Sequence, residues 1–316
     1  MHILQQKFTS MKHVNLIFIS SILVAVLCLN CNNKQKNTTE TLHVVTTTTM
    51  ITDLVAQVGG DLIQLEGLMG SGIDPHLYKA SEGDVAKLSN ADIIFYNGLH
   101  LEGKLIGVFE KMKAKKTIAI SDALDKKHLI SSESFANNYD PHIWFNINHW
   151  IKATQLISKT LSEHMPEQHL IFSKNANTYI EKLKELDLFL KEKIEELPKD
   201  KRILVTAHDA FNYFGNAFEF QVVGLQGLST ATEAGVKDVQ NLSNFIIKHS
   251  IKAIFIESSV PKRTIEALQA SVNSKGYHVS IGGELYSDAL GDKDQFEGTY
   301  IGMFKHNVNT IVNALK

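Results

Sequence analysis

From Leu42 to the end of the chain, short runs of β-branched and apolar residues alternate with longer segments in which apolar residues recur every three or four positions. Runs of the first kind predict buried strands, and segments of the second kind predict amphipathic helices. Such an alternation is typical of α/β folds with mostly parallel sheets. The predicted strands cover residues 43–46, 63–65, 92–96 and 117–120 in the first half, and 202–206, 221–223, 253–256 and 278–281 in the second. Two sets of four strands predict two similar lobes.

The segment between the two sets, residues 166–198, predicts one long helix. It begins with Pro166, which is favoured in a first helical turn, and Pro198 marks its end. Its apolar positions recur at helical spacing and are Ala176, Tyr179, Leu183, Leu186, Leu190, Ile194 and Leu197. Such a helix is about 45 Å long, enough to run along both lobes. We interpret it as the link between an N-terminal lobe, residues 42–165, and a C-terminal lobe, residues 199–316. A coiled-coil surface for a partner is the alternative.

The first 31 residues are typical of an export signal, with Met11 as the true start of translation. A charged beginning precedes an apolar run that ends at Cys31, and this run is too short to be a comfortable membrane span. Residues 32–41 are polar and predict a flexible tether. This order of parts resembles that of bacterial lipoproteins, so we predict that Cys31, rather than Cys28, carries the lipid. A plain secretory signal or an uncleaved anchor are the alternatives.

Composition excludes several classes of protein. The formal net charge of the 316 residues is -2, which gives no field that attracts nucleic acid or an anionic membrane. Cys28 and Cys31 are the only cysteines, so the folded part contains neither a disulfide nor a thiolate metal site. A metal ion must therefore be bound by His, Asp or Glu, and only context can single out ligands among the 14 histidines.

The tripeptide Asp-Pro-His occurs twice, at residues 74–76 and 140–142, in a chain with five prolines. Proline fixes its own φ and favours extended geometry in the residue before it, so each tripeptide predicts a stiff loop that presents an imidazole. The adjacent carboxylate is well placed to orient the chain or to accept a proton from a ligating ring. Each loop lies beyond the carboxyl end of a predicted strand, where open α/β sheets bind their ligands. We therefore predict that His76 and His142 bind metal.

Two residues of the second half occupy similar positions. His208 follows the strand at 202–206, and Asp288 follows the strand at 278–281, although Asp288 taken alone is more typical of a helix cap or a turn. His100, which leucines flank, is predicted to be packed or to support a ligand rather than to bind metal. The histidines without a motif are predicted to be structural and are His149, His164, His169, His249, His278 and His306.

In the segments that carry these candidate metal ligands, the sequence resembles the metal-binding receptors of the zinc and manganese ABC importers. This is a family of lipoproteins once described as adhesins. The resemblance runs from about His43 to the C-terminus, and its markers are residues 72–78, 97–102, 140–144, 205–211 and 283–288. It implies two (β/α)4-like lobes joined by one rigid backbone helix, and release by small shifts rather than by a wide hinge. It also implies that one metal ion is bound between the lobes by His76, His142, His208 and Asp288.

The resemblance further implies capture of Zn2+ or Mn2+ and its delivery to the permease and ATPase of an ABC importer. Three imidazoles and one carboxylate suit Zn2+ and also accept copper, nickel or Mn2+. In the resembling family, His at the third position is typical of zinc-linked members, so His208 favours zinc. The His-rich loop of many zinc receptors is absent, since residues 121–139 contain only His128. We predict Zn2+, with Mn2+ as the alternative.

Two other functions are compatible with the same residues. A zinc hydrolase needs an open coordination position and a general base, whereas four protein ligands close the site and no His-Glu-x-x-His motif occurs. A surface adhesin with a purely structural metal would have the same ligands and the same lipid tether. The prediction is therefore an exported, lipid-anchored and monomeric receptor that faces the periplasm or the cell exterior and is not an enzyme.

Overall fold

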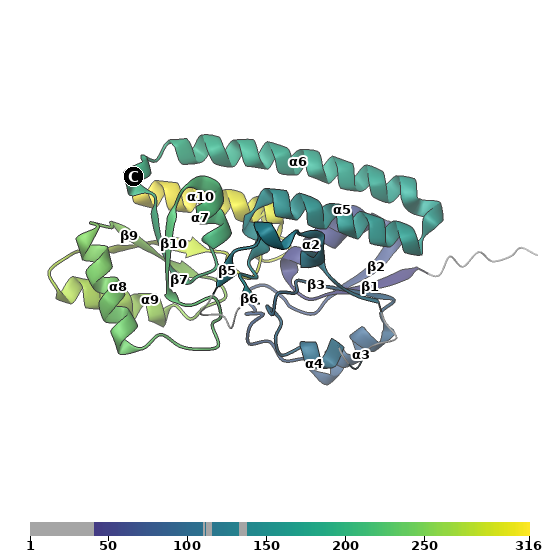
Figure 1. Ribbon diagram of the computed structural model, residues 1–316, viewed down its shortest axis with the longest axis horizontal. Helices are drawn as coiled ribbons and strands as arrows, with labels where there is room; N and C mark the ends of the chain where they lie inside the picture. Colours follow the sequence, from purple (N-terminus) through teal and green to yellow (C-terminus); the bar gives the residue numbers. More distant parts are fainter. Residues whose placement is uncertain (1–40, 110, 112–115, 133–137) are drawn as a thin grey trace, which may run out of the picture. The chain divides into compact units, whose positions relative to one another are not determined.

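The computed structural model describes residues 41–316, except residues 110, 112–115 and 133–137 (Figure 1). The predicted signal, Cys31 and all but the last residue of the predicted tether lie outside the described residues. Leu42–Lys316 form one compact unit. Within the described part of the chain, every helix is too short or too polar to span a membrane.

Four parallel strands form the sheet of the first lobe, in the order β2-β1-β3-β4. Val44 and Val45 lie next to each other in the central strand β1, point to opposite faces, and are both fully buried because helices cover both faces. Helix α2 packs on one face, and α3 and α4 pack on the other. The elements are β1 (Leu42–Thr46), α2 (Thr49–Gly59), β2 (Ile63–Gly67), α3 (Glu82–Asn90), β3 (Ile93–Tyr96), α4 (Ile106–Phe109) and β4 (Lys116–Ala119).

Two parallel strand pairs form the second lobe, where β7 pairs with β8 and β9 pairs with β10. Strand β7 also lies beside β9, so the spatial order is β8-β7-β9-β10. Helices α8 and α9 cover one face, and α7 and α10 cover the other. The elements are β7 (Ile203–His208), α7 (Asn212–Phe218), β8 (Gln221–Gln226), α8 (Val236–Lys248), β9 (Ala253–Glu257), α9 (Arg263–Ser274), β10 (Ser280–Leu285) and α10 (Tyr300–Leu315).

The α/β class, with two lobes and mostly parallel sheets, is confirmed. All eight predicted strands are present, and several extend further toward their carboxyl ends than predicted, as β10 does by reaching Leu285. An antiparallel hairpin of β5 (Ser131–Ser132) and β6 (Asn138–Tyr139) was not predicted. Strands of two residues are too short to show an alternating pattern, so the sequence carries no signal for them.

The predicted long helix is α6 (His169–Glu195), which a 3-10 turn at Pro166–Gln168 precedes. It packs against α5 (Ile147–His164), α2 and α10, and Figure 1 shows it running alongside both lobes. All seven apolar positions of the predicted helix are buried. The borders of the two lobes at either end of this helix remain a prediction.

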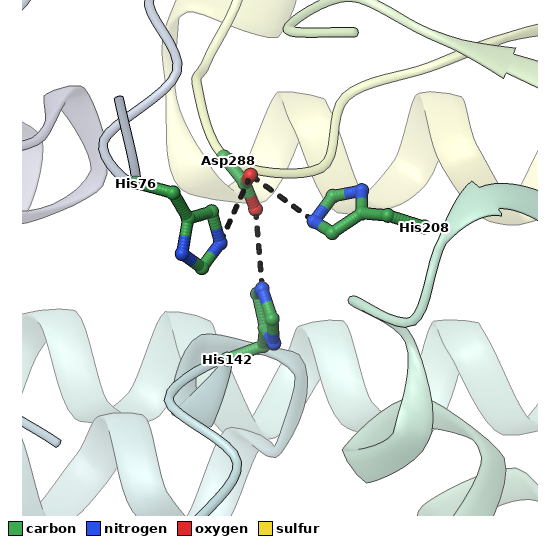
Figure 2. Close-up of side chains that lie close together, drawn as sticks. All are labelled: His76, His142, His208 and Asp288. Carbon is green, nitrogen blue, oxygen red and sulfur yellow. Dashed lines mark ion pairs between the residues drawn. The ribbon is translucent and has the colours of Figure 1, made fainter. Parts of the chain in front are cut away.

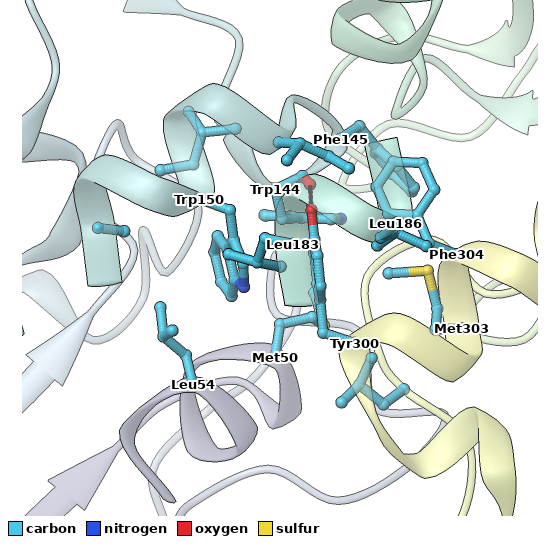
Figure 3. Close-up of a cluster of buried hydrophobic side chains, with 14 of the residues drawn as sticks. Met50, Leu54, Trp144, Phe145, Trp150, Leu183, Leu186, Tyr300, Met303 and Phe304 are labelled. Carbon is cyan, nitrogen blue, oxygen red and sulfur yellow. Dashed lines mark hydrogen bonds between the residues drawn. The ribbon is translucent and has the colours of Figure 1, made fainter. Parts of the chain in front are cut away.

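A single hydrophobic core extends through both lobes. It contains side chains from the inner faces of both sheets and from α2, α5, α6, α7 and α10. At its centre Trp150 of α5 stacks on Tyr300 of α10 with ring centroids 4.9 Å apart, and the Tyr300 hydroxyl donates to the carbonyl of Trp144 at 2.6 Å (Figure 3). Because bending between the lobes would break this core, its continuity favours small local shifts over a wide hinge.

The buried face of α6 can be tested with two leucines of the same helix. Leu190 is fully buried, whereas Leu188 is 62% exposed. Replacing Leu190 by Ala is expected to lower the free energy of unfolding by about 2–5 kcal/mol, because it leaves a cavity in the shared core. Replacing Leu188 by Ala is expected to change it by less than about 0.5 kcal/mol. Urea unfolding of the metal-free protein measures both, and equal losses would contradict this packing.

Candidate metal centre

His76 lies in the loop between β2 and α3, and its side chain is almost fully buried. Its backbone N–H donates to Asp74 Oδ1 at 2.8 Å, so the carboxylate closes the turn around Pro75. The end of the loop is fixed at Tyr78, whose hydroxyl donates to Asp84 Oδ2 at 2.8 Å. Asp84 also belongs to the capping box that begins α3. The loop thus holds the imidazole at the carboxyl edge of the sheet.

His142 follows the second copy of the same motif and is fully buried. Asp140 Oδ1 accepts the backbone N–H of His142 at 2.9 Å and lies 2.7 Å from the ring Nδ1. The other oxygen, Oδ2, accepts from Asn212 at 3.1 Å. A carboxylate at Nδ1 requires the proton on that nitrogen, which leaves the lone pair of Nε2 free to bind a metal. The predicted orienting role of the adjacent Asp is therefore seen in this copy.

The buried carboxylate of Glu102 supports the second tripeptide, residues 140–142, through Asn97. Glu102 accepts from the Thr47 hydroxyl and from the backbone N–H of Asn97, both at 2.7 Å, and Asn97 in turn donates to the carbonyl of Pro141 at 2.9 Å. The three residues after Asn97 all have positive φ, and the last of them is His100 with a φ of 64°. His100 is exposed. The prediction that it is packed or supports a ligand is therefore wrong, because this left-handed turn directs it outward.

His208 is the last residue of β7, and Glu257 is the last residue of the adjacent β9. Glu257 Oε1 accepts the backbone N–H of His208 at 2.9 Å, and Oε2 lies 2.6 Å from the ring Nδ1. Both side chains are fully buried. Glu257 therefore orients His208 as Asp140 orients His142. Sequence reasoning missed it, although its place at a strand end is the signal that singled out His208.

Asp288 follows β10 and faces the three rings (Figure 2). The Trp144 indole donates to the carbonyl of Ser287 at 2.9 Å, and the hydroxyls of Ser287 and Ser259 lie 3.0 Å apart. These contacts fix the chain on the amino side of Asp288. Its carboxylate is fully buried.

The four predicted side chains converge on one point. The Nε2 atoms of His76, His142 and His208 lie 3.7, 3.6 and 3.1 Å from the nearest Asp288 oxygen. One ligand atom from each of the four residues can be chosen so that all four lie within 4.8 Å of one another. Ligands about 2.0–2.1 Å from a tetrahedral zinc ion are separated by about 3.3–3.4 Å. The spacing therefore fits a single ion with little rearrangement.

Several polar atoms of this group are buried without a hydrogen bond among the described residues, although they lie near one another. Within the part of the chain that the structure describes, Nε2 of His76, Nε2 of His142 and both oxygens of Asp288 are buried without a hydrogen bond. Such atoms are rare in folded proteins because leaving them unpaired costs about 1–3 kcal/mol each. A divalent cation would satisfy both of these nitrogens and one oxygen of Asp288 together.

Burial and charge affect the pKa values of the group differently: the neutral form is favoured at His76, and the charged forms are favoured at His208 and Asp288. Burial lowers the pKa of His76 to about 3, so its ring is neutral and ready to ligate at physiological pH. Burial also acts to lower the pKa of His208, but the carboxylates of Glu257 and Asp288 outweigh it and raise that pKa well above its usual value. Burial would raise the pKa of Asp288, and the imidazoles of His208, His142 and His76 instead hold it well below its usual range. A metal ion at His208 would therefore compete with a proton for this ring.

Comparisons with known proteins show what this chain is similar to. The family model described as zinc-uptake complex component A, periplasmic, matches residues 44–314. The manganese-binding lipoprotein MntA of Bacillus subtilis is 47% identical over 282 residues, which cover 89% of this chain and 92% of MntA. The zinc-binding protein TroA of Treponema pallidum is 45% identical over 273 residues, which cover 86% of this chain and 88% of TroA.

Two solved structures of metal-binding proteins are also similar to this chain. The periplasmic zinc-binding protein TroA of Treponema pallidum superimposes with a TM-score of 0.85 at 45% identity, over 87% of this chain and 99% of that one. The Mn-bound periplasmic metal-binding protein of Candidatus Liberibacter asiaticus superimposes with a TM-score of 0.76 at 27% identity, over 87% of this chain and all of that one.

Metal affinity is expected to rise with pH, because a proton on His208 competes with the ion. Replacing Glu257 by Gln removes a charge that favours that proton and also weakens the ring as a ligand. We expect the variant to bind Zn2+ about 10- to 100-fold more weakly than the wild type at pH 8. This difference in affinity should shrink as the pH falls, because the proton on His208 then competes less strongly in the variant than in the wild type. Competition titrations with a chelator between pH 6 and 8 measure both effects.

The matched control is Glu266→Gln, which makes the same change at an exposed position of α9. It should reproduce the wild-type pH profile. A Glu257→Gln profile parallel to that of the wild type would mean that Glu257 does not act through the protonation of His208.

Proposed function

Because this chain belongs to the zinc-uptake component A family of metal-binding receptors of ABC importers, we propose that it captures one Zn2+ ion outside the cytoplasm and delivers it to such an importer. The observation that carries the proposal is the convergence of three imidazole Nε2 atoms and one carboxylate, all of them buried, with each nitrogen 3.1–3.7 Å from an Asp288 oxygen. His76, His142, His208 and Asp288 are the ligands in this proposal.

The donor set supports zinc over manganese. Three nitrogens and one carboxylate suit Zn2+, whereas Mn2+ favours sites that are richer in oxygen. Zn2+ also binds nitrogen ligands more tightly than Mn2+ when both are present. The relatives do not discriminate, since MntA is named for manganese and TroA for zinc. Mn2+ is therefore the alternative cargo.

A receptor accounts for the site better than a hydrolase does. Hydrolysis requires an open position on the metal for water and a base beside it. Here the four ligands leave no vacant position on a tetrahedral ion, and two further buried carboxylates, Asp140 and Glu257, lie at the Nδ1 atoms of two rings. The relatives reported above are likewise named as binding proteins and lipoproteins.

Delivery requires partners and a location. In this proposal the lipidated Cys31 anchors a monomeric receptor to a bacterial membrane, and the receptor hands its ion to the permease, which the ATPase drives. The family supports these partners, because several relatives are named as substrate-binding lipoproteins of metal or manganese ABC transporters. An adhesin with a structural metal would keep its ion, whereas a receptor must exchange it.

The proposal predicts one tightly bound Zn2+ per chain in protein purified without a histidine tag. The ion should outcompete Mn2+ at equal concentrations, and His142→Ala should lose it because this ring is a ligand with a fixed orientation. Metal content is measured by mass spectrometry after dialysis against equimolar Zn2+ and Mn2+.

The control is His128→Ala, because His128 is exposed and lies on a short 3-10 turn outside the group of four. This variant should retain the ion. Preferential retention of Mn2+ would keep the site but overturn zinc as the cargo, and full retention by His142→Ala would remove His142 from the ligands.

A further inference from the structure

The two Asp-Pro-His motifs use their aspartates differently. In the second copy, Asp140 lies against the ring of His142 and orients it. In the first copy, Asp74 Oδ1 accepts the backbone N–H of His76, and Oδ2 accepts the hydroxyl of Thr230 at 2.5 Å. Thr230 belongs to the loop between β8 and α8 in the second lobe. The same motif thus fixes a ring in one copy and joins the two lobes in the other.

Three of the four ligands are fixed in ways that do not involve Thr230. A carboxylate lies at Nδ1 of both His142 and His208. The chain after Asp288 is attached to the first lobe, because the backbone N–H of Leu290 donates to the Thr49 hydroxyl at 2.8 Å. Each of these anchors lies within or beside the continuous core.

His76 is held differently, because its loop lies at the surface. Two apolar side chains of this loop are exposed, Ile73 by 40% and Leu77 by 44%. Two side-chain hydrogen bonds of the loop reach the second lobe. One joins the hydroxyl of Ser71 to Asp292 Oδ1 at 2.5 Å and is exposed to solvent. The other joins Asp74 to Thr230, whose side chain is buried.

The bond between Asp74 and Thr230 is the stronger candidate for holding the loop in place. A hydroxyl that donates to a carboxylate makes a short, charge-assisted bond, and shelter from water strengthens it. The loop that carries Thr230 also has room to withdraw, since it lines a hollow of about 470 Å3 together with the start of α8. Its neighbours Ala231 and Thr232 are exposed.

We propose that the hydrogen bond between Thr230 and Asp74 is a latch that sets how long the metal stays bound, with His76 as the ligand that leaves first when the latch opens. Thr230 and Asp74 are positioning residues in this account, since neither contacts the ion. The inference rests on the proposed function, which it deepens by naming what controls release from that site.

The latch is tested by the rate of Zn2+ release from the loaded protein into excess fluorescent chelator. Thr230→Val keeps the shape of the side chain but cannot donate, so release is expected to become about 10- to 100-fold faster, while the association rate changes little. Thr230→Ser keeps the hydroxyl and should stay within about twofold of the wild type, as should Thr232→Val, which makes the same change at an exposed site of the same loop.

The absorption spectrum of the Co2+-loaded protein distinguishes a latch at Thr230 from a general disturbance of the metal site by the substitution. Since Thr230→Val leaves all four ligands in place, its visible absorption bands should match those of the wild type. If Thr230→Val is folded and releases Zn2+ at the wild-type rate, the latch is wrong although the proposed function stands. If the wild type binds no Zn2+, the proposed function itself fails.

A second variant covers the case in which Thr230→Val does not fold. Asp74→Asn keeps an oxygen that can accept the backbone N–H of His76 but removes the charge that strengthens the bond to Thr230. It should release Zn2+ faster than the wild type, and a rate no faster than that of the wild type would overturn the latch.

Discussion

The structure depends on a set of buried polar atoms that the chain leaves without partners. The Nε2 atoms of His76 and His142 and both oxygens of Asp288 are buried without hydrogen bonds among the described residues. Keeping such atoms together in a dry interior opposes folding, because each loses its contacts with water. A divalent cation that these atoms bind would relieve this cost at both nitrogens and at one oxygen of Asp288, so binding it would also stabilise the fold. Cargo binding and stability are therefore linked through the same atoms.

The shared core explains how these atoms stay together. Asp288 belongs to the second lobe by sequence, yet its segment is attached to the first lobe. The α2 residue Asp53 accepts the backbone N–H of Tyr300 at 3.0 Å and so caps the start of α10, and the Trp144 indole donates to Ser287. The four converging side chains are consequently preorganised by one core that spans both sheets. The loop of His76 reaches the surface, where Ile73 and Leu77 are exposed.

Local patterns in the sequence account for most of the fold. Strands with continuous apolar runs, such as β3 and β9, and the regular spacing of buried positions in α6 could be predicted because each signal is confined to one element. The four converging residues could be singled out because each follows a strand or lies in a repeated motif. Glu257 also lies at a strand end, but its role and that of Thr230 could not be predicted, since they depend on partners 49 and 156 residues away. Such contacts follow from how the lobes pack, which no local pattern encodes.

The most direct test of the account is anomalous diffraction at the zinc edge from crystals of the Zn2+-loaded protein. The account predicts one strong peak, about 2.0–2.2 Å from Nε2 of each of the three histidines and from an oxygen of Asp288. A peak coordinated by other residues, or the absence of any peak at this position in protein that carries stoichiometric zinc, would contradict it.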